Sequence, residues 1–477
     1  MTRSPPPRRE HDLVGELDIP ADAYYGIHSA RAVANFPISG ETIGSYAELV
    51  EGLALVKQAA ALANRDLGVL GPAEADAICR ACEDIRAGHL HDQFVVDPIQ
   101  GGAGTSTNMN ANEVIANRAL EKLGRSRGEY DRLHPIDHVN CSQSTNDVYP
   151  TAVRVALSLV TGRLLSALGL LGGEFDHKAV EFADVVKVGR TQLQDAVPMT
   201  LGQEFGAYGA MVAQNVRLLE ERREALCEVN LGGTAVGTGL QAPPGYAESA
   251  CRHLAELTGM PIVLAADLVE ATQDVGPLVQ LSSAVKVTAL RLSKICNDLR
   301  LLSSGPRAGL EEITLPAVQA GSSMMPGKVN PVIPEVVNQI AFEVIGHDLT
   351  VTMAAEGGQL ELNAFEPVIM RALYQAITHL EAGARVLAER CVSGITARRR
   401  HLSEMADHTV GVVTALNSRL GYSQTTELAR EALATGRDVE ELVEEHHLLQ
   451  PEELDSLLEP RRVAGLEAPE RPAPSSD

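Results

Sequence analysis

Residues 321–335 read GSSMMPGKVNPVIPE. Two glycines loosen this backbone and three prolines deny it a regular helix, so the segment predicts a loop. Within nine positions the loop carries two adjacent serines, a lysine and an asparagine: Ser322, Ser323, Lys328 and Asn330. Polar side chains on such a loop gather around a concavity and not in a buried core. A lysine in such a concavity favours the binding of an anion, so we expect the loop to close over an anionic ligand.

The composition is typical of a large, mostly helical enzyme. The chain has 477 residues, of which 45% are hydrophobic and only 3% aromatic, with no tryptophan. A chain of this length divides into two or three domains, and a core of leucine, alanine and valine suits helix packing better than a β-sandwich. The formal net charge of −23 argues against a nucleic-acid or acidic-membrane partner. An anionic substrate must therefore be bound by local donors.

The N-terminus and the cysteines predict a cytoplasmic protein. The stretch MTRSPPPRRE is basic but lacks the apolar core of a signal peptide, and no run of about 18 apolar residues appears. Seven cysteines, an odd number, fit reduced thiols better than a disulfide framework. Cys79 and Cys82 form a lone CxxC in an apparent helix, without the second pair or spaced histidine that a zinc site needs.

Four long segments show helical periodicity with few breakers: residues 152–182, 201–229, 278–303 and 333–354. In the second, apolar residues recur three and four positions apart, which predicts one apolar face. Helices of this length are expected to pack as a bundle, and apolar stripes that one chain cannot cover are expected to pack against other copies. The stretch from about Glu459, rich in proline and charge, predicts a disordered tail.

Four further stretches are rich in glycine, serine, threonine and asparagine. They are GGAGTSTNMNANE at 101–113, HPIDHVNCSQSTNDVYP at 134–150, GRTQLQDAVPMTLGQEF at 189–205 and GGTAVGTGL at 232–240. Hydroxyls and backbone amides at helix starts are good carboxylate receptors, because unpaired N–H groups meet the positive end of the helix dipole. One such run alone more often caps a helix than binds a ligand. Four of them beside the lysine loop favour a site for two carboxylates.

Residues 321–331 match GSSxMPxKxNP, and this motif resembles the signature of the aspartase/fumarase superfamily. Its members eliminate an amine or water from a succinyl-type substrate. The four other loops are similar to further shared regions of the superfamily, and the similarity runs from about residue 11 to about residue 455. Three flanking stretches resemble the ammonia-lyases in particular: DIPADAYYGIHSARAVANFPIS, CNDLRLLSSGPRAGL and VTMAAEGGQLELNAFEPVI.

The resemblance implies a mostly α-helical, three-domain fold whose central long-helix bundle forms a homotetrameric core. The expected domains are an N-terminal one at 1–146, a central helical bundle with the lysine loop at 147–400, and a small C-terminal helical domain with the tail at 401–477. Each active site would draw loops from three subunits. The implied reaction is the reversible deamination of L-aspartate to fumarate and ammonia. No cofactor would be required, although divalent cations activate some relatives and could bind at scattered carboxylates.

Transferred position by position, the resemblance also implies roles. Ser322 would be the base that removes the Cβ proton to give an aci-carboxylate intermediate. The β-carboxylate would be bound by Thr105, Ser144, Thr145 and Ser323, the α-carboxylate by Lys328, Asn330 and Thr191, and the amino group by Asn146. A serine is a feeble base at its free pKa, so loop amides and Lys328 would have to stabilise its alkoxide.

Gln192 departs from the fumarase pattern, in which a histidine usually stands at this position. Glutamine can hydrogen-bond to the leaving group but cannot protonate it, so the donor to the amine is left open. Glu335, the partner of that histidine in fumarases, is equally expected as a helix-start carboxylate. His138 matches a secondary anion site of fumarases, and a structural histidine is at least as well supported. The alternatives for the whole chain are a class II fumarate hydratase and a non-catalytic structural relative, which would be expected to have lost loop residues.

Overall fold

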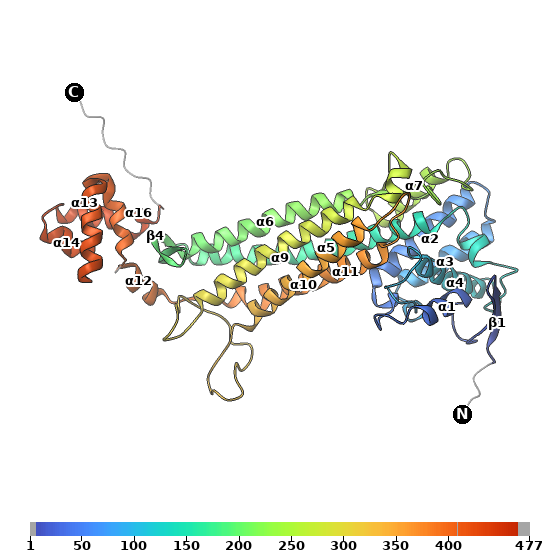
Figure 1. The fold of residues 1–477 in the computed structure, drawn as a ribbon, viewed down its shortest axis with the longest axis horizontal. Coiled ribbons are helices and arrows are strands. Elements are labelled where there is room, and N and C mark those ends of the chain that lie inside the picture. Colours follow the sequence, from blue (N-terminus) through green and yellow to red (C-terminus); the bar gives the residue numbers. More distant parts are fainter. Residues whose placement is uncertain (1–5, 408, 466–477) are drawn as a thin grey trace, which may run out of the picture. The chain divides into compact units, whose positions relative to one another are not determined.

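The computed structural model describes residues 6–407 and 409–465, and its regular structure is mostly helical, as predicted (Figure 1). Four long helices coincide with the four predicted segments, and a fifth was not singled out from the sequence. They are α5 (Thr145–Glu181), α6 (Leu201–Ala225), α9 (Gly276–Leu302), α10 (Val332–Glu356) and the additional α11 (Glu366–Arg390).

The chain divides into two compact units, each built from separate stretches of sequence. Unit 1 comprises residues 1–166, 215–289 and 340–381, and unit 2 comprises residues 167–214, 290–339 and 382–477. The long helices pack against one another within each unit. In unit 1, Ser282 of α9 donates to Asp348 of α10 over 2.8 Å, and in unit 2, Tyr208 of α6 donates to Asp298 of α9 over 3.0 Å. The division into three domains stays a prediction.

Unit 1 also contains a cluster of shorter helices. They are α1 (Ile27–Asn35), α2 (Ala47–Asp66), α3 (Pro72–Arg86), α4 (Thr105–Lys122), α7 (Tyr246–Thr258) and α8 (Leu268–Gln273). Helix α2 packs against both α3 and α7 and is buried over most of its length because its sequence is almost continuously apolar. Gly52 lets α2 approach α5 closely, since a Cβ there would lie 2.6 Å from the carbonyl oxygen of Ala152.

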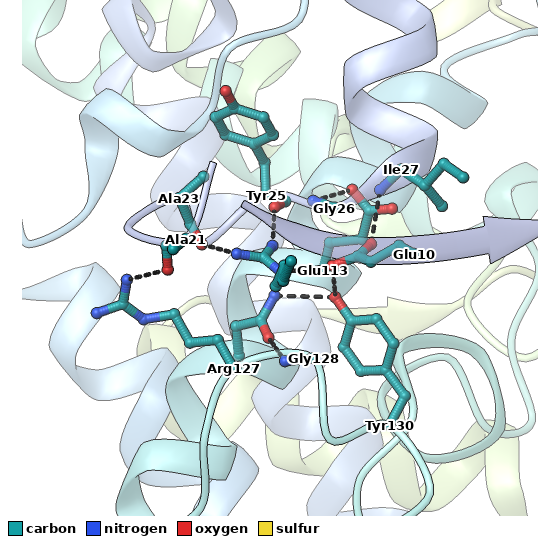
Figure 2. Close-up of polar contacts among 12 residues, drawn as sticks. Glu10, Ala21, Ala23, Tyr25, Gly26, Ile27, Glu113, Arg127, Gly128 and Tyr130 are labelled. Carbon is teal, nitrogen blue, oxygen red and sulfur yellow. Dashed lines mark hydrogen bonds and ion pairs between the residues drawn. The ribbon is translucent and has the colours of Figure 1, made fainter. Parts of the chain in front are cut away.

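Two buried carboxylates hold the start of α1. Figure 2 shows Glu10 and Glu113 converging on the backbone of Gly26 and Ile27. Glu113 accepts the N–H of Gly26 at 2.7 Å, and Glu10 accepts that of Ile27 at 2.8 Å. Glu10 lies in β1 (Arg8–Asp12), which pairs antiparallel with β2 (Gly15–Ile19). Burial raises the pKa of Glu113 to about 7, against hydrogen bonds from Ser29 and the backbone that favour its charged form.

Helix α5 begins at Thr145, seven residues earlier than predicted, although Pro150 lies inside it. Proline has no N–H to donate to the carbonyl four residues back, which is that of Asn146. The side-chain amide of Asn230 donates to this carbonyl over 2.9 Å instead. A partner distant in sequence therefore replaces the missing helical bond, and the periodicity of the sequence could not reveal it.

By length and composition, α5 is also the described helix that could cross a membrane, because its most apolar window has a mean hydropathy of 1.7. More than half of that window is buried inside the protein. Core helices of globular proteins meet the same criteria, so this helix is weak evidence for a membrane span.

Unit 2 contains a hairpin and a C-terminal helical group. The hairpin pairs β3 (Val186–Thr191) with β4 (Gln194–Thr200), and α12 (Arg399–Asp407) packs beside β3. Two further two-residue pairings occur: β7 (Ile313–Thr314) with β8 (Thr396–Ala397) in unit 2, and β5 (Glu228–Val229) with β6 (Val263–Leu264) in unit 1. The C-terminal group consists of α13 (Val413–Thr435), α14 (Val439–Glu445), α15 (Pro451–Leu458) and α16 (Pro460–Val463). The first three pack around a leucine-rich core, and α16 packs against α15 and β4.

The predicted tail begins later than expected. Helix α16 stands just after Glu459, and the buried Ala464 accepts a hydrogen bond from Gln203 over 2.9 Å. These contacts anchor a segment whose composition alone predicts disorder. The rest of the predicted tail, residues 466–477, lies outside the described residues.

Candidate active site

Thr105 is the first residue of α4, as expected of a helix-start site. The residue before it, Gly104, has φ of 90°, and a Cβ there would lie 2.5 Å from the ring of Tyr149. Only glycine fits this entry to the helix. The exposed Thr105 hydroxyl donates to the carbonyl of Gly102 over 2.7 Å, which leaves its oxygen free to accept at the helix start.

Residues 144–147 form a capped start to α5. The Ser144 hydroxyl accepts the N–H of Asn146 at 3.3 Å, while Asp147 Oδ1 accepts the N–H of Ser144 at 2.9 Å. This reciprocal pair is similar to a capping box, with aspartate in the acidic position and the hydroxyl bonded to the N–H two residues on. Thr145 Oγ1 accepts from Asn108 Nδ2 at 3.1 Å. Asn108 lies one turn into α4, so this bond joins the first turns of α4 and α5. The helices that begin at Thr105 and Thr145 are therefore neighbours at their N-termini.

Asp147 also ties the 232–240 loop to α5. Its Oδ2 accepts the N–H groups of Gly232 at 2.9 Å and Thr234 at 3.1 Å, and Asn146 Nδ2 donates to the carbonyl of Ala235 over 2.7 Å. The stretch is a loop, and the next helix starts only at Tyr246. The N–H groups of the loop satisfy a buried carboxylate.

A cleft of about 690 Å³ opens in unit 1 beside these loops. Ser144 lines it, together with side chains of the stretch that precedes α5 and of the 232–240 loop. The main polar contributors are Asp137, Asn140, Ser142, Gln143, Thr234 and Gln241. His138 is not among the lining residues, and its Nδ1 accepts the backbone N–H of His134 at 2.9 Å, which is a structural role.

The lysine loop in unit 2 directs backbone donors at Ser322. Its Oγ accepts the N–H groups of Met324 at 3.1 Å and Met325 at 3.0 Å. The loop is closed at its base, where the Gly321 N–H donates to the carbonyl of Lys328 and Asn330 Nδ2 donates to that of Gly321, both over 2.8 Å. Ser322 and Asn330 are partly buried, whereas Ser323 and Lys328 are exposed.

Thr191 ends β3 and Gln192 lies in the turn of the β3–β4 hairpin, which the sequence analysis did not predict, and the 189–205 stretch then enters α6 at Leu201, where a helix was predicted. The turn residues Gln192 and Leu193 have φ of 53° and 63°. A two-residue hairpin turn with positive φ at both positions is of type I′ and normally uses Asn-Gly or Gly-Gly. Two bulky side chains in the left-handed region are a local strain, and both are exposed at the tip.

The predicted site residues therefore fall into two sets. Unit 1 holds Thr105, Ser144, Thr145 and Asn146, and unit 2 holds Thr191, Gln192, Ser322, Ser323, Lys328 and Asn330. Within the described part of unit 2, no hydrogen bond joins the hairpin tip to the lysine loop. Glu335 lies in the first turn of α10, where a carboxylate is favoured by the helix dipole.

Sequence reasoning missed the buried residues behind these loops, among them Lys57, Asn140, Asp147 and Glu312. One signal was available: Lys57 stands alone in the apolar run LALVKQAAALA. A lysine inside such a run needs a specific partner, and its amine donates to Asn140 Oδ1 at 2.8 Å and Gln143 Oε1 at 3.0 Å. In the part of the chain that the structure describes, no group of three or more histidine, cysteine, aspartate or glutamate residues is arranged to hold a metal ion.

Comparison with known proteins agrees with this architecture. The family model described as lyase matches residues 15–346, and the one described as fumarase C C-terminus matches residues 412–465. A crystal structure of a fumarate lyase/delta crystallin from Brucella melitensis, bound to cobalt, superimposes with a TM-score of 0.93 at 53% identity, covering 96% of this chain and 99% of that one. A class II fumarase from Schistosoma mansoni gives a TM-score of 0.93 at 35% identity, covering 97% of this chain and 100% of that one.

The chain belongs to the aspartase/fumarase superfamily of lyases. Within it, similar curated relatives carry a more specific name. A Pseudomonas canavaninivorans protein named aspartate ammonia-lyase is 56% identical over 96% of both chains. The protein of the same name from Escherichia coli strain K12 is 51% identical over 94% of both chains.

Proposed function

We propose that this chain is an aspartate ammonia-lyase, a carbon–nitrogen lyase that converts L-aspartate reversibly into fumarate and ammonia. The support is twofold. Relatives of that name are 50–56% identical over 94–96% of the chain, and the serines, threonines, lysine and asparagines that the superfamily resemblance singles out are present, with Gln192 as a departure from the fumarase pattern.

The observation that carries the mechanism is the environment of Ser322 Oγ, which accepts two backbone N–H groups. Hydrogen bonds to the charged form of a group lower its pKa, so two amide donors favour the alkoxide over the alcohol. The alkoxide removes the Cβ proton of aspartate, and the electron pair moves onto the β-carboxylate as an aci-carboxylate. The Lys328 ammonium adds a positive charge on the same loop.

The aci-carboxylate carries extra negative charge on its oxygens, and preorganised donors must receive it. Thr105 and Thr145 stand at the starts of α4 and α5, where the helix dipole favours an anion. Ser144 and Ser323 add hydroxyls to this set. Lys328, Asn330 and Thr191 are proposed to bind the α-carboxylate, and Asn146 the amino group.

Expulsion of the amine completes the reaction, as the aci-carboxylate collapses to form the fumarate double bond. Gln192 can hydrogen-bond to the departing group from the hairpin tip but cannot donate a proton as an acid. We therefore propose that the amine leaves with the protons it already carries as an ammonium group.

A homotetramer with sites shared by three subunits is the assembly that we propose. Its support in this chain is an apolar stripe on α10: Phe342, Ile345, Leu349 and Met353 recur at three- and four-residue spacing, with 39–66% of each exposed. An exposed stripe of this kind on a long helix is typical of a face that packs against another copy. Sharing would also bring loops of different chains to one substrate.

We propose that catalysis needs no cofactor and takes place in the cytoplasm. Activation by divalent cations is a separate matter, and treatment with a chelator followed by addition of Mg²⁺ tests it. Full activity after chelation is the expected result, and a further rise on addition of Mg²⁺ would show activation by a divalent cation. The substrate is a small dicarboxylate, and the net charge of −23 opposes a nucleic-acid partner.

One assay tests the function. Purified protein is given L-aspartate and, separately, L-malate, and the ultraviolet absorbance of fumarate is followed. Fumarate from aspartate alone supports the proposal, and fumarate from malate alone would make the chain a fumarate hydratase. Turnover of neither substrate by a well-folded assembly would favour the non-catalytic alternative.

A further inference from the structure

Lys57 is a fully buried lysine in the middle of α2 that the proposed mechanism does not use. Its amine donates to two neutral acceptors, Asn140 Oδ1 at 2.8 Å and Gln143 Oε1 at 3.0 Å. Two acceptors satisfy both N–H groups of an uncharged amine, while an ammonium has a third. The local geometry therefore accommodates either protonation state.

A short chain of hydrogen bonds connects this amine to the predicted carboxylate site. Asn140 Oδ1, which accepts from Lys57, also accepts from Asn108 Nδ2 at 3.1 Å, and the same Asn108 amide donates to Thr145 Oγ1 at 3.1 Å. Asn140 and Gln143 belong to the stretch that lines the unit 1 cleft beside Ser144. Lys57 thus lies beneath the loop and helix start that are proposed to bind the β-carboxylate.

The ionisable groups that face Lys57 are few. Asp147 approaches from α5 and the Cys82 thiol from α3, while α4 contributes the amides of Asn108 and Asn112. From α7, Tyr246 bears on Asp147. Burial lowers the pKa of Lys57 to about 7, against the opposing influence of Asp147. Three backbone N–H groups already share the Asp147 carboxylate.

We propose that Lys57 is a positioning residue whose amine takes up a proton when a dicarboxylate binds at Ser144 and Thr145, so that its charge balances the bound carboxylate. This inference rests on the proposed function. The proton comes from solvent, converts the amine to an ammonium, and returns to solvent when the product leaves. Lys57 does not touch the substrate and acts through Asn140 and Asn108.

A bound carboxylate should attract the Lys57 ammonium strongly because the buried surroundings of Lys57 have a low polarisability. An anion at the N-terminus of α5 interacts with a buried ammonium through protein and not through water, so the attraction is only weakly screened. That attraction must raise the affinity of Lys57 for its proton by the same factor by which the proton raises the affinity for the anion. An acidic protein thereby gains a local cation when its anionic ligand arrives.

The test uses succinate, a saturated dicarboxylate that cannot undergo elimination and is fully ionised above neutral pH. Calorimetric titration of the wild-type assembly in buffers of different ionisation enthalpy counts the protons taken up. We expect nearly one proton per site at pH 8.5 and little uptake at pH 6, where Lys57 is already charged. The Kd of succinate should rise by close to tenfold per pH unit above about pH 7.5.

Two variants test whether Lys57 is the group that takes up the proton. Lys57→Met removes the amine, and Lys57→Gln keeps amide donors for Asn140 and Gln143 and is the variant better suited to fold. Either should abolish both the uptake and the pH dependence of Kd. Lys122→Met, which removes an amine that lies against Asp84, is the matched control and should keep both.

Proton uptake that persists in a Lys57 variant would overturn the inference. Succinate binding to the wild type without proton uptake would overturn it as well. The proposed function is judged separately by aspartate turnover. An enzyme that produces fumarate but takes up no proton with succinate disproves only the role of Lys57. A protein that neither turns over aspartate nor binds succinate disproves the proposed function.

Discussion

Arg190, one residue before Thr191, forms an ion pair with the fully buried carboxylate of Glu312. The other oxygen of that carboxylate lies 2.8 Å from Lys187 Nζ, and Lys187 in turn lies 2.7 Å from Glu204. Charges are expensive to bury unless each has a partner. A network of paired charges therefore anchors the hairpin that carries Thr191 and Gln192, and it holds the strained tip in place.

Glu312→Gln should destabilise the protein strongly. The change leaves Lys187 and Arg190 without their shared counter-charge, and removing one partner of a buried pair costs on the order of 3–5 kcal/mol. The free energy of unfolding from urea titration, at one fixed protein concentration, measures the loss. Glu311→Gln is the control, because Glu311 pairs with Arg398 near the surface and its loss should cost at most about 1 kcal/mol. Equal losses in the two variants would show that burial of the Glu312 pair is unimportant.

The same hairpin shows where the sequence was insufficient. The long helices could be predicted because their apolar residues repeat with the helical period over many turns. The hairpin has a Gln-Leu turn where Asn-Gly would be expected, so it carries no local turn signal. The partners of Asp147 lie 85 and 87 positions away at Gly232 and Thr234, and only the tertiary fold brings them together. The lysine loop could be predicted because its glycines and prolines indicate a loop and its serines, lysine and asparagine suit an anionic ligand.

Ser322→Ala should lower kcat by about a thousandfold, because loss of a general base typically costs about 10²- to 10⁴-fold. KM should change little, since in the proposed mechanism the hydroxyl acts on the Cβ proton and does not hold a carboxylate. Steady-state kinetics with aspartate measures both constants. Ser323→Ala is the neighbouring comparison and should mainly raise KM. More than a tenth of wild-type kcat in a correctly assembled Ser322→Ala enzyme would assign the proton transfer to another group.

Glu113 should make the protein less stable as the pH rises. Burial raises its pKa from 4.5 to about 7, so the native state binds more protons than the unfolded state between these values. The stabilising contribution is complete below pH 4.5 and is lost as the pH rises through 7. The difference in unfolding free energy between wild type and Glu113→Gln should follow this curve in urea titrations.

Glu121, which also lies on α4, should show the opposite dependence of stability on pH. Burial raises the pKa of Glu121, but hydrogen bonds from Arg118, Tyr24 and Arg127 outweigh it and leave the pKa below its usual value. Its contribution is present above pH 4.5 and is lost in acid, so Glu121→Gln should show the reverse pH dependence. The same slope in both variants would contradict the assignment to Glu113.

Mixed assemblies test the sharing of sites. Ser322 and Thr191 lie on separate loops of unit 2 that no described hydrogen bond joins. If they serve one site from different subunits, inactive Ser322→Ala and Thr191→Ala proteins should regain activity after dissociation and reassociation together. Up to about a quarter of the sites would be free of both lesions. Each variant reassociated alone is the control, and well-formed mixed tetramers that stay inactive would mean that both residues come from one chain.

Gln192→His tests whether the hairpin tip touches the leaving group. Glutamine does not titrate, so the wild-type pH profile of kcat/KM should lack an ionisation from this position. An unperturbed imidazole changes charge near pH 6.5, and a carboxylate such as Glu335 in the assembled site would raise that value. The variant should keep aspartate deamination with a new acid limb in its profile, and a trace of malate dehydration is expected because an imidazolium can protonate a leaving hydroxide. Gln192→Asn, which shortens the side chain without adding a titrating group, is the control and should leave the shape of the profile unchanged. An active Gln192→His enzyme with the wild-type profile would place this residue outside contact with the substrate.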